Sequence, residues 1–207
     1  MSLAAQLAAG VAELGLAIAP DTQKKLLAYL ELMAKWNRVY NLTALRNPRE
    51  WVTHHLLDSL SVLPHIQGPR VVDVGSGAGL PGLVLAMARP DWQVVSVEAV
   101  DKKAAFQRQV AAELALANVQ VEGRRVEEVA QAGGADTVVS RAFSSLADFV
   151  GLTRHLLKPG GRWAAMKGRL PGEEIAALPG EVRVREIIEL SVPGLNAERC
   201  VVLMERG

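Results

Sequence analysis

Residues 71–82 decide the fold and read Val71-Val72-Asp73-Val74-Gly75-Ser76-Gly77-Ala78-Gly79-Leu80-Pro81-Gly82. A short apolar run comes first, three alternating glycines follow it, and a proline then suits the first turn of a helix. Glycine is required in so tight a turn, and it lets a ligand come close to the main chain. The order of strand, glycine loop and helix therefore predicts a ligand-binding loop in an α/β sheet. A turn that binds no ligand is disfavoured, because closely spaced glycines lower stability.

Two classes of cofactor fit the glycine spacing. Gly77, Gly79 and Gly82 satisfy the dinucleotide fingerprint, and Glu98, about 20 residues further on, could accept hydrogen bonds from the ribose of either cofactor. Asp73 separates the two classes, because a carboxylate there would repel a pyrophosphate but attract the ammonium and sulfonium groups of S-adenosylmethionine. The loop favours S-adenosylmethionine, and a nicotinamide-dependent oxidoreductase is the alternative.

The chain after residue 70 alternates between strands and helices. The predicted strands are residues 71–74, 94–97, 119–121, 137–140 and 162–166. The predicted helices are residues 82–88, 102–114 and 146–157. These strands are apolar throughout, which is typical of a sheet covered on both faces. Residues 182–190 and 200–204, joined through Pro193-Gly194, predict a terminal antiparallel strand pair.

The chain before residue 70 has a helical pattern. Leu26, Leu30 and Met33 share one face of a predicted helix. Asn47 and Pro48 are typical of the start of a second helix, which should end near residue 63. We expect a helical N-terminal extension over residues 1–69, packed on a Rossmann-like domain over residues 70–207.

Composition limits the possible partners. The formal net charge of +1 and the aromatic share of 4% mean that contact with nucleic acid must come from local patches. The apolar N-terminus lacks a basic leader and contains Glu13, so it predicts an amphipathic helix, and no stretch suits a membrane span. The single cysteine, Cys200, cannot form an internal disulfide. We therefore expect a cytoplasmic monomer without membrane contact.

Several groups of residues, spread over nearly the whole chain, occur together in one known family. They are Trp36-Asn37-Arg38-Val39-Tyr40-Asn41-Leu42-Thr43, His55-Leu56-Leu57-Asp58-Ser59-Leu60, the 73–82 loop, Arg125-Val126-Glu127-Glu128, Ser140-Arg141-Ala142-Phe143, Leu157-Lys158-Pro159-Gly160-Gly161, Met166-Lys167-Gly168 and Val192-Pro193-Gly194-Leu195. With them the sequence resembles the bacterial ribosomal RNA small subunit methyltransferase G family, also called the glucose-inhibited division protein B family. The Asn-Leu-Thr, Asp-Ser-Leu and Ser-Arg-Ala-Phe groups are the specific ones, whereas the loop occurs in many methyltransferases.

The resemblance implies a fold and a reaction. The fold is that of class I S-adenosylmethionine-dependent methyltransferases, a Rossmann-like, seven-stranded and mostly parallel sheet with helices on both faces and a helical N-terminal extension. The reaction is methylation of N7 of a guanine, guanine 527 in the 530 loop of 16S RNA, within the small ribosomal subunit or an assembly intermediate. Guanine N7 has a lone pair and no proton, so no residue is expected to act as a general base.

The same resemblance implies the residues of the site. By position, the methyl donor would contact Gly75, Leu80, Glu98, Val126, Glu127 and Arg141, to which the loop adds Asp73, Gly77 and Gly79. The RNA candidates are Arg38, His55, Arg141 and Lys167. Arg141 and Lys167 each end a predicted parallel strand, should face the ligand crevice there and are the positioning candidates.

One departure from the family is visible, since His54 stands where the family often has arginine or lysine. This puts in doubt a phosphate contact by that side chain. His54 and Asp58 lie one helical turn apart, but no further ligands accompany them, so no metal site is expected.

Two further function classes compete with this interpretation. A non-enzymatic RNA-binding module would need aromatic and basic residues interleaved on one surface, and the aromatic residues are too scattered for that. A small-molecule methyltransferase would share every donor-site residue and is disfavoured only by the family groups outside the loop.

Overall fold

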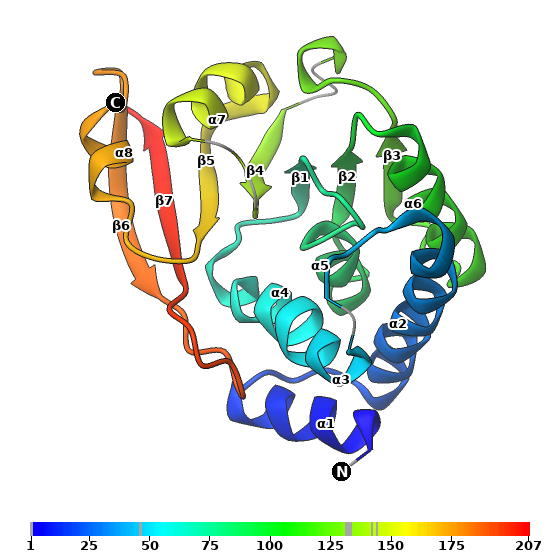
Figure 1. Cartoon of the computed structure of the whole chain (residues 1–207). Helices are drawn as coiled ribbons and strands as arrows, with labels where there is room; N and C mark the ends of the chain where they lie inside the picture. The colour runs from blue at the N-terminus through cyan, green and yellow to red at the C-terminus, as the bar shows by residue number, and fades with distance from the viewer. Residues whose placement is uncertain (1, 46, 131–133, 142, 144) are drawn as a thin grey trace.

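A computed structural model describes residues 2–45, 47–130, 134–141, 143 and 145–207 (Figure 1). These residues form a seven-stranded sheet with the order β3-β2-β1-β4-β5-β7-β6. The strands are β1 (Arg70–Val74), β2 (Gln93–Val97), β3 (Val119–Glu122), β4 (Ala135–Ser140), β5 (Leu157–Lys167), β6 (Val182–Glu189) and β7 (Cys200–Arg206). β1 to β5 pair in parallel, and β7 runs antiparallel to both β5 and β6. The predicted mostly parallel sheet and its terminal antiparallel pair are confirmed.

The helices lie before the first strand and between later strands. They are α1 (Leu3–Glu13), α2 (Pro20–Tyr40), α3 (Pro48–Trp51), α4 (Asp58–Ser61), α5 (Gly82–Ala88), α6 (Asp101–Glu113), α7 (Leu146–Thr153) and α8 (Gly172–Ala176). Short 3-10 turns are η2 (Leu63–His65), η3 (Val126–Glu128) and η4 (Arg154–Leu156), and η1 (Val52–Leu57) is a π-helical stretch between α3 and α4. Among the described residues, no helix is both long and apolar enough to cross a membrane.

Two details differ from the sequence-based expectation, and one predicted residue lies outside the described part of the chain. The helix expected over 146–157 ends earlier, because β5 already begins at Leu157, which pairs with Ala135 ahead of an irregularity in the ladder. The helix predicted from Pro48 is one helical run, but it contains the π-helical η1. Ala142 of the Ser-Arg-Ala-Phe group lies outside the described residues.

The N-terminal helices share one apolar core with the helices that cover the sheet. Leu7 of α1, Tyr29 of α2 and Leu56 of η1 belong to the same buried cluster as Leu83 of α5 and Phe106 of α6. In Figure 1 the blue and cyan segments accordingly lie against α5 and α6. Packing continues across residue 69, and a domain boundary at that residue stays a prediction.

The opposite face of the sheet is covered by α7 and η3. Phe149 of α7 and Val126 of η3 pack there with Trp163 of β5. β7 lies between β5 and β6, so Cys200 at its start is buried. Burial is the main reason that the pKa of the Cys200 thiol is raised. The only cysteine is therefore a packed strand residue.

Candidate functional site

The carboxyl ends of the parallel strands gather most of the predicted site residues at one edge of the sheet. The glycine loop follows β1, Glu98 follows β2, and Val126 lies shortly after β3. Arg141 directly follows β4, and Lys167 is the last residue of β5. This edge, where open α/β sheets bind their ligands, is the candidate site.

Gly75, Gly77 and Gly79 all have left-handed backbone conformations, with φ of 66°, 60° and 92°. They differ in their surroundings. A Cβ atom on Gly75 or Gly77 would meet no atom of the described part of the chain within 4 Å beyond its own chain neighbours, whereas one on Gly79 would lie 2.4 Å from Cδ1 of Leu83. The first two glycines therefore present bare main chain to open space, and the third is needed for packing against α5.

Glu98 fastens the loop from the neighbouring strand. Its Oε2 accepts a hydrogen bond from the Gly77 N–H at 2.7 Å, and its Oε1 accepts one from the Val100 N–H at 2.8 Å. The carboxylate is buried. Each oxygen keeps a second lone pair, so Glu98 could still accept hydrogen bonds from a hydroxyl of a ligand.

Two residues that the sequence analysis missed brace the other side of the loop. Gln107 of α6 donates from Nε2 to Ser76 Oγ at 2.7 Å and to the Gly77 carbonyl at 2.8 Å. The Tyr29 hydroxyl of α2 donates to the Ala78 carbonyl at 2.9 Å. Neither side chain belongs to a motif around the loop, so only the fold reveals the contact.

Asp73 was predicted to attract a cationic ligand, and in the structure it also holds the main chain together. It is fully buried, and its Oδ2 accepts a hydrogen bond from the Gly82 N–H at 2.7 Å, which ties β1 to the start of α5. A Cβ on Gly82 would lie 2.8 Å from this oxygen, so Gly82 makes room for the carboxylate. Oδ1 has no hydrogen-bond partner among the described residues.

The Asp73 carboxyl has a raised pKa that lies near neutral pH. Burial raises the pKa of its carboxyl to about 7, although the hydrogen bond from Gly82 and the positive charge of Arg141 oppose the rise. The negative charge of Glu98 adds to it. A cationic group placed near this carboxyl would favour its ionised form.

Two cavities adjoin at this edge. The first, here called the loop cavity, has a volume of about 110 Å³ and is lined by Leu42, Thr43, His55, Gly75, Ser76, Gly77, Ala78, Leu80 and Arg141. The second, here called the arginine cavity, has a volume of about 310 Å³ and is lined by Leu45, His54, His55, Asp58, Arg141, Met166, Lys167, Gly168 and Arg199. His55 and Arg141 line both cavities and so stand between them.

A larger cavity, of about 660 Å³, lies away from this edge. Its lining includes Val71, Val94, Val119 and Ala135, which belong to the amino-terminal halves of β1 to β4. Ligands of open α/β sheets bind outside the carboxyl ends of the strands, so the two smaller cavities form the candidate site.

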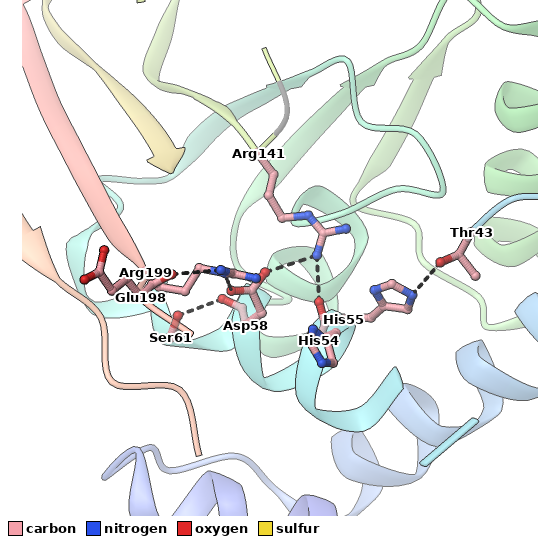
Figure 2. A network of polar contacts seen from close by, with 8 residues as sticks. All are labelled: Thr43, His54, His55, Asp58, Ser61, Arg141, Glu198 and Arg199. Carbon is pink, nitrogen blue, oxygen red and sulfur yellow. Dashed lines mark hydrogen bonds and ion pairs between the residues drawn. The ribbon is translucent and has the colours of Figure 1, made fainter. Parts of the chain in front are cut away.

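Asp58 joins two arginines that are far apart in the sequence (Figure 2). Arg141 donates from Nη1 to Asp58 Oδ2 at 3.2 Å and to the His54 carbonyl at 3.0 Å. Arg199 donates from Nε to Asp58 Oδ1 at 3.0 Å. The sequence analysis missed Arg199, which belongs to none of the family groups. The available signal was Asp58 itself, because a carboxylate in an apolar helix needs a cationic partner.

His55 is held by the π-helical η1 with its ring between the two cavities. Its Nε2 lies 3.1 Å from Thr43 Oγ1, and its Nδ1 has no partner among the described residues. Burial, helped by the positive charge of Arg141, lowers the pKa of His55 to about 4. The imidazole is therefore neutral near pH 7 and adds no charge to the site.

The remaining predicted residues occupy different positions. The Lys167 ammonium donates to Glu174 Oε2 of α8 at 2.7 Å, so it lines the arginine cavity as half of an ion pair. Arg38 is exposed in the last turn of α2 and lines neither cavity. Val126 is buried in η3 and Glu127 is exposed there. Ligand contacts of these residues stay predictions.

Two solved structures similar to this chain are named as SAM-dependent methyltransferases. A SAM-dependent methyltransferase from Geobacter sulfurreducens, solved in complex with S-adenosyl-L-homocysteine, matches with a TM-score of 0.56 over 86% of this chain and 98% of its own, at 14% sequence identity. A SAM dependent methyltransferase from Aquifex aeolicus matches with a TM-score of 0.56 over 72% of this chain and 90% of its own, at 20% identity. Identities this low show the fold alone, and the predicted class I methyltransferase fold is confirmed.

Comparison of sequences goes further. The family model described as rRNA small subunit methyltransferase G (GidB) matches residues 22–202. A ribosomal RNA small subunit methyltransferase G from Aromatoleum aromaticum is 56% identical over 209 residues, which cover 99% of each chain. The protein of the same name from Nitrosospira multiformis is 54% identical over 214 residues, which cover 100% of this chain and 99% of its own. The chain belongs to the rRNA small subunit methyltransferase G family.

Proposed function

We propose that this chain uses S-adenosylmethionine to methylate N7 of one guanine in 16S RNA of the small ribosomal subunit. The observation that carries the proposal is the 56% identity, over 99% of both chains, to a relative named ribosomal RNA small subunit methyltransferase G. The open glycine loop and the two adjoining cavities at the carboxyl edge support it, because they offer space for a donor and an acceptor side by side.

The residues present fit S-adenosylmethionine. Gly75 and Gly77 leave bare main chain for close approach. Asp73 has a buried oxygen that finds no partner among the described residues, and this oxygen suits a cationic ligand. Glu98 can add a hydrogen bond from a ribose hydroxyl to those it already accepts. We assign the remaining donor contacts to Gly79, Leu80, Val126, Glu127 and Arg141. When bound, S-adenosylmethionine supplies an electrophilic methyl group.

The main catalytic task of the chain is to position guanine N7 against the methyl group of the donor. Guanine N7 carries a lone pair and no proton, so no side chain has to remove one. Orientation of two reactants can lower a barrier by roughly 7–11 kcal/mol in favourable cases. His55 suits the boundary between the cavities because it is neutral near pH 7 and does not oppose the positive charge that a methylated purine acquires. Arg141, paired with Asp58, is partly neutralised there.

Methyl transfer to purified substrates tests the proposal. The protein is incubated with methyl-labelled donor and with naked 16S RNA, assembly intermediates or intact small subunits, and the label is mapped by digestion and mass spectrometry. We expect N7-methylguanine at one position in at least one of these substrates. Absence of the label from all three would refute the assignment.

The competing cofactor is tested separately. Thermal unfolding with S-adenosylhomocysteine or with a nicotinamide dinucleotide reports which one binds the folded chain, because a bound ligand raises the midpoint temperature. We expect a rise with S-adenosylhomocysteine alone. A rise only with the dinucleotide would favour an oxidoreductase.

A further inference from the structure

The arginine cavity holds more positive than negative charge. Its lining includes the cations Arg141, Lys167 and Arg199. Asp58 pairs with both arginines, and Glu174 pairs with Lys167. The lining of this concave site thus carries three cations and one carboxylate, Asp58, and is positively charged. Such a site suits an anion.

Asp58 uses each of its oxygens for a different arginine. The Asp58 side chain is only 3% exposed, whereas those of Arg141 and Arg199 are 26% and 23% exposed. Arg199 also donates from Nη1 to the Glu198 carbonyl. In the described part of the chain, the Nη2 of each arginine has no acceptor. The carboxylate thus fixes both guanidinium groups and leaves each a donor for another partner.

We propose that Arg141 and Arg199, fixed by Asp58, bind one backbone phosphate of the acceptor RNA beside the target guanine. This inference rests on the proposed function and adds Arg199 as a substrate-binding residue and Asp58 as a positioning residue. Guanidinium groups suit phosphate because their planar donors match its oxygens. A phosphate is a better neighbour for these cations than the purine ring, which becomes positively charged on methylation.

Two arginines on one aspartate are more than charge balance of a buried carboxylate requires. One arginine would neutralise Asp58, and the second adds a further cation to the lining of the cavity. Arg141 directly follows β4 and lies 83 residues from Asp58 in the sequence. Arg199 directly precedes β7 and lies 141 residues from Asp58. Holding them in place before the RNA arrives reduces the conformational entropy lost on binding.

The test compares Arg199→Gln and Arg199→Lys with the control Arg183→Gln. Arg183 is an exposed residue of β6 that pairs with Glu205 and lies outside the arginine cavity. For each variant we measure the affinity for S-adenosylhomocysteine by calorimetry, the affinity for small subunits over a range of salt concentrations, and KM and kcat for methyl transfer. Thermal unfolding checks that each variant is folded.

We expect Arg199→Gln to weaken small-subunit binding about tenfold, to raise KM and to lower the salt slope by about 1, as loss of one phosphate contact does. Arg199→Lys should recover part of the affinity, since it keeps the charge but not the planar fork. The affinity for S-adenosylhomocysteine should change by less than about twofold, and Arg183→Gln should behave like the unchanged protein.

Asp58→Asn tests the positioning role. It removes the charge that holds both arginines while nearly keeping the shape of the side chain, so we expect KM for small subunits to rise. Because Arg141 is also assigned a donor contact, the affinity for S-adenosylhomocysteine should fall as well, which Arg199→Gln should not cause. Folding is verified by circular dichroism. Unchanged KM and salt slope in this folded variant would remove Asp58 from the proposal.

Other outcomes overturn the inference while sparing the proposed function. If Arg199→Gln weakens S-adenosylhomocysteine binding but not small-subunit binding, Arg199 binds the carboxylate of S-adenosylmethionine and not a phosphate of the RNA. If Arg199→Gln and Arg183→Gln behave alike, the site binds no anion. If the unchanged protein methylates no RNA, the proposed function fails, and the salt slope of binding still tests the phosphate contact.

Discussion

Gly77 and Gly79 share a left-handed backbone but face different surroundings, and alanine substitution should separate their roles. Alanine at either φ costs about 1–2 kcal/mol of folding free energy. Only Gly79→Ala also collides with Leu83, which should add about 1–3 kcal/mol. We therefore expect Gly79→Ala to lower stability more in urea unfolding, and Gly77→Ala to weaken S-adenosylhomocysteine binding at least about tenfold by filling the open face. A Gly77→Ala variant that binds the ligand normally would contradict this reading of the loop.

The raised pKa of Asp73 predicts a dependence of stability on pH. In the unfolded chain this carboxyl ionises near its ordinary value of 3.8, whereas in the folded chain it ionises near 7. The folded state therefore binds more protons between these values, so Asp73 destabilises the fold progressively as pH rises from about 4 to about 7. The stability of the unchanged protein relative to Asp73→Asn should fall over this range in urea unfolding. A constant difference would contradict the shift.

The affinity for S-adenosylhomocysteine should also depend on the ionisation of Asp73. If the ammonium of S-adenosylhomocysteine favours ionised Asp73, affinity should rise between pH 6 and pH 8 about this pKa, and Asp73→Asn should remove that rise. The charged groups that affect Asp73 are Arg141 and Glu98, and His55, with a pKa near 4, titrates outside the range. Calorimetry at several pH values measures this, and the Asn variant corrects for titration of the ligand itself. Parallel profiles would place the ligand cation elsewhere.

Single residues show where sequence reasoning reached its limit. The glycines, Glu98 and Arg141 were predictable because each directly follows a strand, and parallel strands bring those positions to one edge. Gln107 and Arg199 were not, because their contacts depend on how distant segments pack and leave no local pattern. Burial of Asp73 was also beyond the sequence, since it arises from helix packing around β1.

At the scale of elements, α2 supports the glycine loop through one buried hydroxyl, and this contact can be tested. Tyr29→Phe removes the hydrogen bond to the Ala78 carbonyl, which should lower stability by about 0.5–1.5 kcal/mol and weaken S-adenosylhomocysteine binding. Tyr40→Phe is a matched control on the same helix, since Tyr40 is 41% exposed and lies outside both cavities. Urea unfolding and calorimetry measure both effects. Equal behaviour of the two variants would show that the brace has no influence on the loop.

Strands and long helices were predictable because their apolar periodicity is local. The strands β1 to β4 contain short valine-rich runs, and α2 shows its buried face in Leu26, Leu30 and Met33. The π-helical η1 and the short α8 were not predicted. π-Helical stretches are rare and occur mostly as short insertions within α-helices, and α8 is five residues long with no buried residue. His55 was predicted as a site residue, but the π-helical geometry of η1 that carries it and the partner of Lys167 on α8 were not.

For the whole molecule, the shared core predicts cooperative unfolding. Because Leu7, Tyr29 and Leu56 pack in one cluster with Leu83 and Phe106, the N-terminal helices should unfold together with the sheet. We expect a single calorimetric transition and coincident urea curves from circular dichroism and tryptophan fluorescence. A fragment of residues 70–207 should fail to fold alone. Two separate transitions would show that the N-terminal segment is an independent unit.

Cys200 makes the native chain ready for site-specific labelling. Its thiol is covered by the sheet and its pKa is raised, so maleimides should react with it slowly in the folded state. A second cysteine placed at Val39, whose side chain is 70% exposed, would then be the preferred point of attachment for a fluorophore. Encounter with the small subunit could be followed in real time by fluorescence from the end of α2, without first removing the native cysteine.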